Sequence, residues 1–194
     1  MSKKTGIRRM GLILSSVLLV GCLGRPEGVS PVEQLDTSRY LGTWYEVARL
    51  DHSFERGLSN VTADYSMRED GGLRVINRGY SAEEGDWQQA EGRAYRIEEN
   101  QPGHLKVSFF GPFFGSYVVF ELDSVDYQYA FVAGNTTNYL WLLARTPTIS
   151  DELKTQFLQR AESLGFAVED LIFVDQGRNE NSVDRNATVP LKNG

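Results

Sequence analysis

Cysteine and histidine are scarce in this chain of 194 residues. Cys22 is the single cysteine, so an intramolecular disulfide, a CxxC redox pair and any multi-cysteine zinc site are excluded. The two histidines, His52 and His104, are too few for a histidine-rich metal centre. We therefore expect no metal site and no cofactor.

Positive charge is also in short supply. The chain has 20 Lys and Arg residues against 26 Asp and Glu, which gives a formal charge of −6. Four of the cations lie before residue 10, where there is no acid, so the rest of the chain has 16 basic against 26 acidic residues, or −10. Phosphate backbones repel such a surface. We expect no nucleic-acid partner.

A long hydrophobic run is absent as well. The most apolar stretch, Met10–Gly21, has 12 residues, whereas a membrane-spanning helix needs about 20. This stretch follows the basic segment Met1–Arg9 and ends in small residues, a pattern that is typical of a secretory signal. Residues 1–21 are therefore predicted to be removed.

The end of this signal resembles the lipobox of bacterial lipoproteins, in the segment Leu19-Val20-Gly21-Cys22. In that family the cysteine thiol receives a diacylglycerol, the signal is cut before it, and the new amino group is acylated with a chain such as palmitate. Leu23 stands where an inner-membrane retention signal has aspartate. The resemblance implies a bacterial outer-membrane anchor, a domain that faces the periplasm, and a flexible spacer over residues 22–35. An ordinary secretory signal with a stray cysteine is the alternative.

Short β-type runs separated by turn residues fill the chain between about residues 36 and 176. Most links between them are too short for parallel crossovers, so neighbouring strands should be antiparallel. The eight runs are Thr43–Leu50, Asn60–Met67, Leu73–Tyr80, Trp87–Ile97, Leu105–Phe110, Tyr117–Leu122, Tyr127–Ala133 and Tyr139–Arg145.

One helix is predicted after these strands. Thr148 or Ser150 can cap it, and its apolar side chains recur on one face, which must pack on the outer surface of the sheet. A short strand at Leu171–Val174 follows, and Gly177–Gly194 is expected to be a disordered polar tail. This pattern is compatible with an open sandwich and with a closed barrel, and alternation alone does not decide between them.

Two segments resemble the signatures of the lipocalin family. Tyr40–Arg49 contains a Gly-x-Trp motif at the start of the first strand, and Asn138–Arg145 opens with an amide before an aromatic residue and ends in arginine. The segments 109–113 and 145–150 resemble the bacterial outer-membrane lipocalins and apolipoprotein D. The resemblance covers residues 36–176. It implies an all-β fold: an eight-stranded antiparallel up-and-down barrel with one C-terminal α-helix packed outside.

The resemblance also implies structural roles for five residues. Trp44 would close the base of the barrel with Arg145 packed across its indole, and Gly42 would allow the tight turn into the first strand. Asn138 and Tyr139 begin the later signature, where many relatives have aspartate in place of Asn138.

The family binds apolar or amphipathic small molecules inside the barrel, which implies a fatty acid, lysophospholipid or phospholipid ligand here. Strand alternation then suggests which side chains point inward. The candidate cavity residues are Tyr95, Leu105, Val107, Phe109, Phe114, Tyr117, Phe131 and Trp141. The cations of the middle strands are candidates for contact with an anionic headgroup, and these are Arg74, Arg78, Arg93, Arg96 and Lys106.

No group of residues has the spacing of a catalytic site. Asp51-His52-Ser53 has the residue types of a hydrolase triad, but neighbours on an extended strand point to opposite faces. We therefore predict no catalytic residue and a non-enzymatic carrier that stores or transports lipid in the cell envelope, including under membrane stress. The alternatives are a carrier of haem, bilin or sterol, a lipid-modifying lipocalin enzyme, and a structural protein with a filled barrel. Because some relatives form dimers, a homodimer stays open.

Overall fold

The structure is a computed structural model that describes residues 23–180. The predicted signal peptide, its cleavage site and the acylated Cys22 lie outside the described residues, as does the tail from residue 181 onward.

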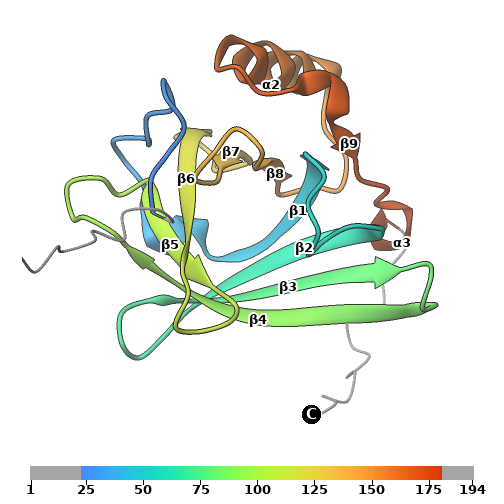
Figure 1. Ribbon diagram of the computed structural model, residues 1–194, viewed down its shortest axis with the longest axis horizontal. Helices are drawn as coiled ribbons and strands as arrows, with labels where there is room; N and C mark the ends of the chain where they lie inside the picture. The colour runs from blue at the N-terminus through green and yellow to red at the C-terminus, as the bar shows by residue number, and fades with distance from the viewer. Residues whose placement is uncertain (1–22, 181–194) are drawn as a thin grey trace, which may run out of the picture.

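The described chain forms one closed antiparallel barrel (Figure 1). The sheet order is β2-β3-β4-β5-β6-β7-β8-β1-β9, and β1 also pairs with β2, which closes the ring of eight strands. The short strand β9 adds along β1. The strands are β1 (Gly42–Arg49), β2 (Leu58–Met67), β3 (Leu73–Ser81), β4 (Asp86–Arg96), β5 (His104–Ser108), β6 (Gly115–Leu122), β7 (Tyr129–Ala133), β8 (Leu140–Ala144) and β9 (Ile172–Phe173). The prediction of an eight-stranded barrel is confirmed.

The barrel has two different ends. Because neighbouring strands are antiparallel, successive turns alternate between these ends. The closed end holds the one-turn helix α1 (Thr37–Tyr40) and the start of β1. The other end, called the mouth below, is formed by the turns β1–β2, β3–β4, β5–β6 and β7–β8, which span residues 50–57, 82–85, 109–114 and 134–139.

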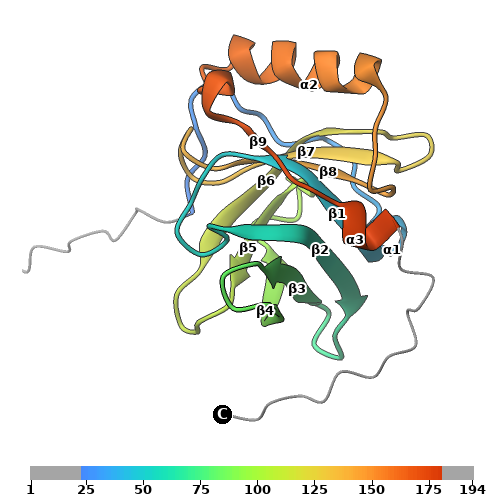
Figure 2. The same ribbon diagram turned by 90° about the vertical axis from the view of Figure 1, so that its right-hand side faces the viewer.

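A helix covers one side of the barrel from outside. This helix, α2 (Asp151–Ser163), is capped by Ser150, whose side chain accepts a hydrogen bond from the Leu153 N–H. Its buried residues Phe157 and Ala161 pack in one apolar cluster with the outward-facing side chains of β7 and β8. Figure 2 shows α2 lying across the outside of the barrel. A 3₁₀ turn, η1 (Val168–Asp170), links it to β9. The single long helix is therefore packed outside, as predicted.

The segment before the barrel differs from the predicted flexible spacer. Val29 and Leu35 are buried, and the N–H of Val32 donates to the carbonyl oxygen of Val119 at 2.9 Å. Two valines and a leucine offer enough apolar surface to hold this segment against the barrel wall. In the described part of residues 22–35, the chain is therefore packed rather than free.

The segment after β9 also packs, which corrects the prediction that the tail is disordered from Gly177. Helix α3 (Gly177–Glu180) begins there, and the N–H of Arg178 donates to Oδ1 of Asn60 at 2.7 Å. Just before it, Nε2 of Gln176 donates to the carbonyl oxygens of Glu46 and Val61. Gln176 thus connects β1 and β2 through a side chain where their direct pairing has ended.

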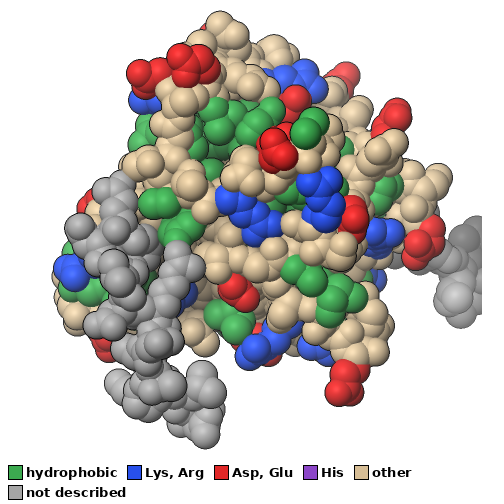
Figure 3. Space-filling model, turned by 180° about the vertical axis from the view of Figure 1, so that it is seen from behind, with side chains coloured by type: hydrophobic (Ala, Val, Ile, Leu, Met, Phe, Trp, Pro, Cys, Tyr) green, Lys and Arg blue, Asp and Glu red, His purple; other side chains and the backbone are tan. Residues whose placement is uncertain are grey.

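The back of the molecule carries charges of both signs without one dominant patch (Figure 3). Hydrophobic side chains gather below the helix at the top of that view. Within residues 23–180, no helix combines the length and the apolar character needed to cross a membrane.

Candidate ligand-binding cavity

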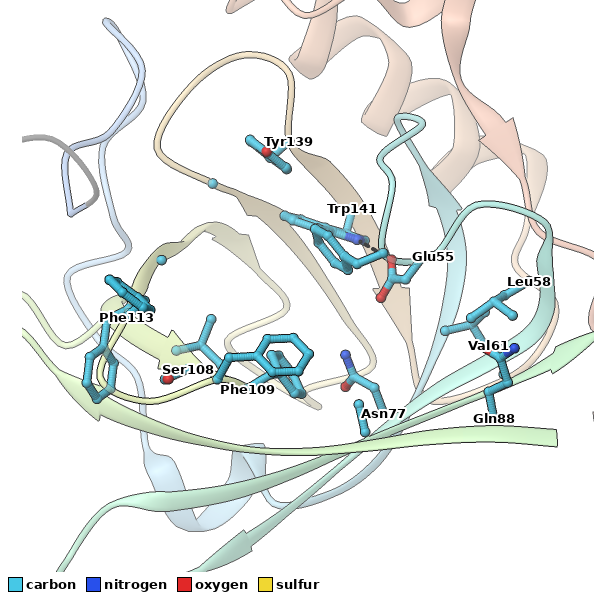
Figure 4. A pocket seen from close by; sticks show the side chains of 18 of the residues that line it. Glu55, Leu58, Val61, Asn77, Gln88, Ser108, Phe109, Phe113, Tyr139 and Trp141 are labelled. Atoms are coloured by element: carbon cyan, nitrogen blue, oxygen red, sulfur yellow. Dashed lines mark hydrogen bonds between the residues drawn. The ribbon is translucent and has the colours of Figure 1, made fainter. Parts of the chain in front are cut away.

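The barrel contains a cavity of about 530 Å³ that opens at the mouth. Figure 4 shows its aromatic and aliphatic side chains surrounding a common space. The lining comes from every turn of the mouth except β3–β4, together with inward positions on several strands. It includes Phe54, Glu55, Leu58, Val61, Asn77, Arg78, Gln88, Ala90, Val107, Ser108, Phe109, Phe110, Phe113, Phe114, Tyr139 and Trp141. Its volume falls within the range of about 300–1,000 Å³ that is usual for small-molecule sites.

The closed end of the barrel is filled by protein. Trp44 is completely buried, its indole N–H donates to the carbonyl of Tyr40, and the Arg145 guanidinium lies 3.8 Å above its ring. Arg145 also donates to the carbonyl of Thr43 at 2.9 Å. Gly42 has a φ of +87°, a conformation that favours glycine, and a side chain there would approach Arg145. These contacts match the structural roles that the resemblance implied for Gly42, Trp44 and Arg145.

Three tyrosines complete this floor. The hydroxyl of Tyr117 is 2.8 Å from that of Tyr40 and 3.0 Å from that of Tyr65. Burial raises the pKa of all three phenols, so they remain neutral hydrogen-bonding groups. The predicted cavity residue Tyr117 therefore belongs to the floor. Leu105, which pairs with it across β5 and β6, is also buried outside the cavity lining.

Four of the eight candidate residues line the cavity: Val107, Phe109, Phe114 and Trp141. Trp141 points inward, as its parity predicted, and Phe109 lies against Gly92, where an added Cβ would come within 2.8 Å of the phenyl ring. The phenyl ring of Phe109 fits at this position because Gly92 has no side chain. Ligand contact at the four positions remains a prediction.

The assignment of Phe131 and Tyr95 to the cavity is corrected. Phe131 lies on the outer face of β7, with its ring 4.9 Å from that of Phe157 in α2. Tyr95 follows the inward-facing Ala94 and so points outward, where its hydroxyl donates to Asp70 at 2.9 Å. Each error comes from choosing the aromatic residue of a strand when its smaller neighbour faces inward.

A buried ionic cluster lies in the wall beside Trp141. Nη1 of Arg49 donates to Oε1 of Glu46 at 2.6 Å, and Nη2 donates to the backbone carbonyls of Glu55 and Leu58. The indole N–H of Trp141 donates to Oε2 of Glu55 at 3.2 Å, as the dashed line in Figure 4 shows. Arg49 thereby fixes the β1–β2 turn, and Trp141 fixes the carboxyl of Glu55 at the cavity wall.

The cluster shifts the pKa values of its members. Burial raises the pKa of Glu46, and the nearby charge of Glu55 raises it further, while the pKa of Glu55 is raised chiefly by burial. Two carboxyls that face one guanidinium in a dry site favour retention of one proton. Glu46, whose pKa is raised more strongly, holds it, so Glu55 keeps its negative charge. Burial, followed by the charge of Arg49, lowers the pKa of His52 to about 4. The imidazole is therefore neutral at pH 7, and it stacks on Phe54 at 4.0 Å.

Sequence reasoning missed several lining residues. Glu55 lies in a polar turn that carries no periodic signal, so nothing in the sequence marked it as buried. Asn77 could have been found, because it shares the parity of the buried Leu73 and Val75 and is therefore a polar residue on an inward face. Tyr139, predicted as a structural signature residue, also lines the cavity and stacks with Trp141. Asn138 is exposed in the β7–β8 turn beside it.

The cations proposed for an anionic headgroup lie mostly outside the barrel. Arg74 pairs with Glu91 on the surface, while Arg93 and Lys106 lie over the ring of Phe114. Arg96 donates to Leu35 and Thr37 near the closed end. Arg78 reaches the rim, with its guanidinium 4.1 Å from the ring of Trp87. Their interpretation as headgroup contacts is therefore not supported by their positions.

Part of the rim of the mouth is formed by exposed phenylalanines. Phe54, Phe110 and Phe113 line the cavity and also expose 57%, 79% and 79% of their surface.

Across the described residues, no set of three or more His, Cys, Asp or Glu side chains is placed to hold a metal ion. The segment Asp51-His52-Ser53 forms part of a turn rather than an extended strand.

Comparisons with known proteins agree with this geometry. Residues 35–176 match the model of the lipocalin-like domain family. The chain is 59% identical over 170 residues to "Outer membrane lipoprotein Blc" of Vibrio cholerae, which covers 88% of this chain and 99% of that protein. It is 33% identical to apolipoprotein D of Bos taurus over 81% and 91% of the two chains. The crystal structure of the cockroach allergen Per a 4 has a TM-score of 0.63 at 21% identity, with 80% and 98% covered. The resemblance predicted from the sequence is thus confirmed, and the chain belongs to the lipocalin-like family.

Proposed function

We propose that this protein is a lipid carrier of the bacterial envelope, anchored in the outer membrane through Cys22. It binds a fatty acid, lysophospholipid or phospholipid in the barrel cavity, and stores or transports it during envelope maintenance and membrane stress. The observation that carries the proposal is the open cavity of about 530 Å³, lined largely by apolar and aromatic side chains. No reacting group is required of the protein for this role.

The energetics of chain burial support this function. Burying an acyl chain of about 16 carbons gives a gross free energy near 12 kcal/mol, at roughly 0.8 kcal/mol for each methylene. Association costs reduce this value. Micromolar binding is therefore within reach of an apolar cavity without any strong polar contact.

Titration with a fluorescent fatty acid tests the proposal. The mature chain with Cys22→Ser, delipidated, should show saturable binding with one site per barrel, or one per dimer. Trp141→Glu should weaken this binding by at least about tenfold, because it places a charge against the acyl chain. Its far-ultraviolet circular dichroism should match that of the parent chain. Absence of saturation up to roughly 50 μM would contradict the carrier function.

Mass spectrometry of an extract of the native protein separates lipid from the other cargoes. Haem, a bilin or a sterol in stoichiometric amount would replace the lipid proposal with one of the alternatives. Turnover of a lipid substrate would point to an enzyme.

The relatives named outer membrane lipoprotein support the anchor. Cells that express the chain with labelled palmitate should incorporate label into the membrane fraction. Cys22→Ser should abolish the label and release the protein to the soluble fraction, and membrane retention of this variant would contradict the anchor. Cross-linking of the purified protein tests whether it forms a homodimer.

A further inference from the structure

The cavity contains polar groups within its apolar lining. Glu55 from the β1–β2 turn, Asn77 from β3 and Gln88 from β4 all contribute to its surface. Figure 4 shows Glu55 and Asn77 on opposite sides of the same space, with their polar ends directed toward it. These residues supply hydrogen-bonding atoms where a hydrocarbon chain would need none.

Two of the polar atoms in the lining lack a partner. Oδ1 of Asn77 and Oγ of Ser108 are buried, yet neither has a hydrogen-bond partner among residues 23–180. Ser108 is 95% buried overall, since 5% of its surface is exposed. Buried polar atoms are normally paired. Both oxygens are shielded from the cavity, so Asn77 must turn its amide to present an oxygen to a ligand.

The cavity lining carries one acid, Glu55 on the inner wall, and one base, Arg78 at the rim. Arg78 has its guanidinium over the ring of Trp87, and the hydrogen bonds of Arg49 run to Glu46 and to backbone carbonyls. Neither cation is therefore directed at the carboxyl end of a ligand beside Glu55.

We propose that Glu55 determines which headgroups the cavity accepts. A lipid whose polar group donates hydrogen bonds, such as an ammonium or a hydroxyl, binds better than a lipid of the same chain length that ends in a free carboxylate. This inference rests on the proposed lipid-carrier function and narrows its ligand class.

The physical reason is the match between donors and acceptors. Glu55 carries acceptor oxygens, one of which already accepts from Trp141. On the other side, the unpaired Oδ1 of Asn77 becomes a second acceptor once its amide turns toward the cavity. An ammonium or hydroxyl satisfies these groups. A carboxylate brings a second negative charge and no donor into a site with little water, where like charges repel strongly.

Three probes with one hydrocarbon chain test the proposal. Oleate, monooleoylglycerol and oleylamine differ only in the polar group, and each is titrated against a neutral fluorescent lipid bound to the delipidated Cys22→Ser chain. Oleylamine and monooleoylglycerol should displace it at concentrations about tenfold lower than oleate. Equal displacement by all three would overturn the assignment of Glu55, while saturable binding by none of them would contradict the carrier function itself.

The variant Glu55→Gln isolates the charge. Glutamine keeps an oxygen to accept from Trp141 but removes the carboxylate, so oleate should gain about tenfold and oleylamine should lose about tenfold. The matched control is Glu84→Gln, which removes the same charge from an exposed turn of the mouth that does not line the cavity. An unchanged ranking in Glu55→Gln would overturn the proposal.

A second variant covers the case in which Glu55→Gln fails to fold. Asn77→Asp places a carboxylate on the opposite wall, so it should weaken oleate binding by a further factor of about ten and strengthen oleylamine binding. Stronger oleate binding in this variant would contradict an acceptor-rich site. Urea midpoints and circular dichroism establish that each variant is folded.

Discussion

At the closed end of the barrel, Trp44 is fully buried beneath Arg145, whereas at the mouth Phe110 and Phe113 expose 79% of their surface. The two regions also differ in whether their buried polar groups have hydrogen-bond partners. The floor hydroxyls of the tyrosines are linked in a chain, while Asn77 in the cavity has an unpaired buried oxygen. The side chains of the closed end are thus packed and paired within the protein, whereas the cavity and its mouth contain exposed rings and an unpaired polar atom.

This difference separates stability from function along the barrel axis. Fully packed and paired groups stabilise the fold. Exposed rings and unpaired buried atoms reduce stability, and natural proteins keep them chiefly where a ligand or partner completes them. Substitutions at the closed end should therefore change the free energy of unfolding most, and substitutions at the mouth should change binding most.

The largest effect is expected for Trp44→Ala. It removes a buried indole, its hydrogen bond and its contact with Arg145, so the free energy of unfolding should fall by about 3–5 kcal/mol. Urea denaturation followed by circular dichroism measures it. The control Trp87→Ala, on the outer face near the mouth, should cost only about 1 kcal/mol. Equal losses in the two variants would show that the two ends are energetically alike.

Arg49→Met should have the next largest effect, because Arg49 is buried and paired although it lies at the mouth end of β1. It leaves Glu46 and Glu55 buried without their cation, which costs about 3 kcal/mol in comparable buried pairs. The loss should shrink as the pH falls, because protonation neutralises both carboxyls. Urea midpoints at several pH values measure this trend, and adding Glu46→Gln should restore part of the stability. A loss that does not vary with pH would argue against the two carboxyls as its source.

Acidification should weaken the mouth through His52, whose pKa is about 4 in the folded chain. The unfolded chain binds this proton below about pH 6.5, so between these values the unfolded state holds more protons and stability falls as the pH falls. The loss should reach roughly 1–3 kcal/mol at pH 4.

The variant His52→Phe provides the reference for this effect, because it keeps a ring against Phe54 but cannot titrate. The free energy of unfolding of the parent chain minus that of His52→Phe should decrease from pH 6.5 to 4 and stay level above pH 7. The raised pKa values of Glu46 and Glu55 have the opposite sign, since they favour the folded state at low pH. Because Nε2 of His52 lies 3.2 Å from Oε2 of Glu55, the two chains are compared with Glu55→Gln present in both. A difference that stays constant down to pH 4 would mean that His52 is not held neutral.

The smallest effects are expected at the rim. Phe110→Ser and Phe113→Ser remove rings that are already mostly exposed, so stability should change by less than about 0.5 kcal/mol. Solubility of the delipidated chain should increase, as measured by light scattering at rising protein concentration. A loss of more than about 2 kcal/mol would show that the rim is part of the core after all.

The sequence allowed the strands to be predicted one by one, and the family resemblance implied that they close into a barrel, but the cavity was predicted only in part. Turn residues and alternation place the strands within a few residues, and the inward parity of Trp141 follows from β8 alone. Alternation does not show which side chains of β7 point inward, because both faces of this strand are buried. The barrel interior covers the face with Ala130, and α2 covers the face with Phe131, so apolar residues occur on both. Glu55 could not be predicted, since its burial depends on Arg49 holding the turn across the wall.

The packing of Val29 sets a limit on how far the protein can reach. Val29 comes seven positions after Cys22, and an extended chain spans at most about 3.5 Å per position, or roughly 25 Å. With the proposed anchor at Cys22, this short connection would keep the barrel beside its own bilayer and out of reach of a distant one. Inserting a flexible decapeptide after Gly24 should extend the range of proximity labelling, and an unchanged range would show that Val29 detaches in the native protein. Delivery over longer distances would then depend on a second molecule that comes to the carrier.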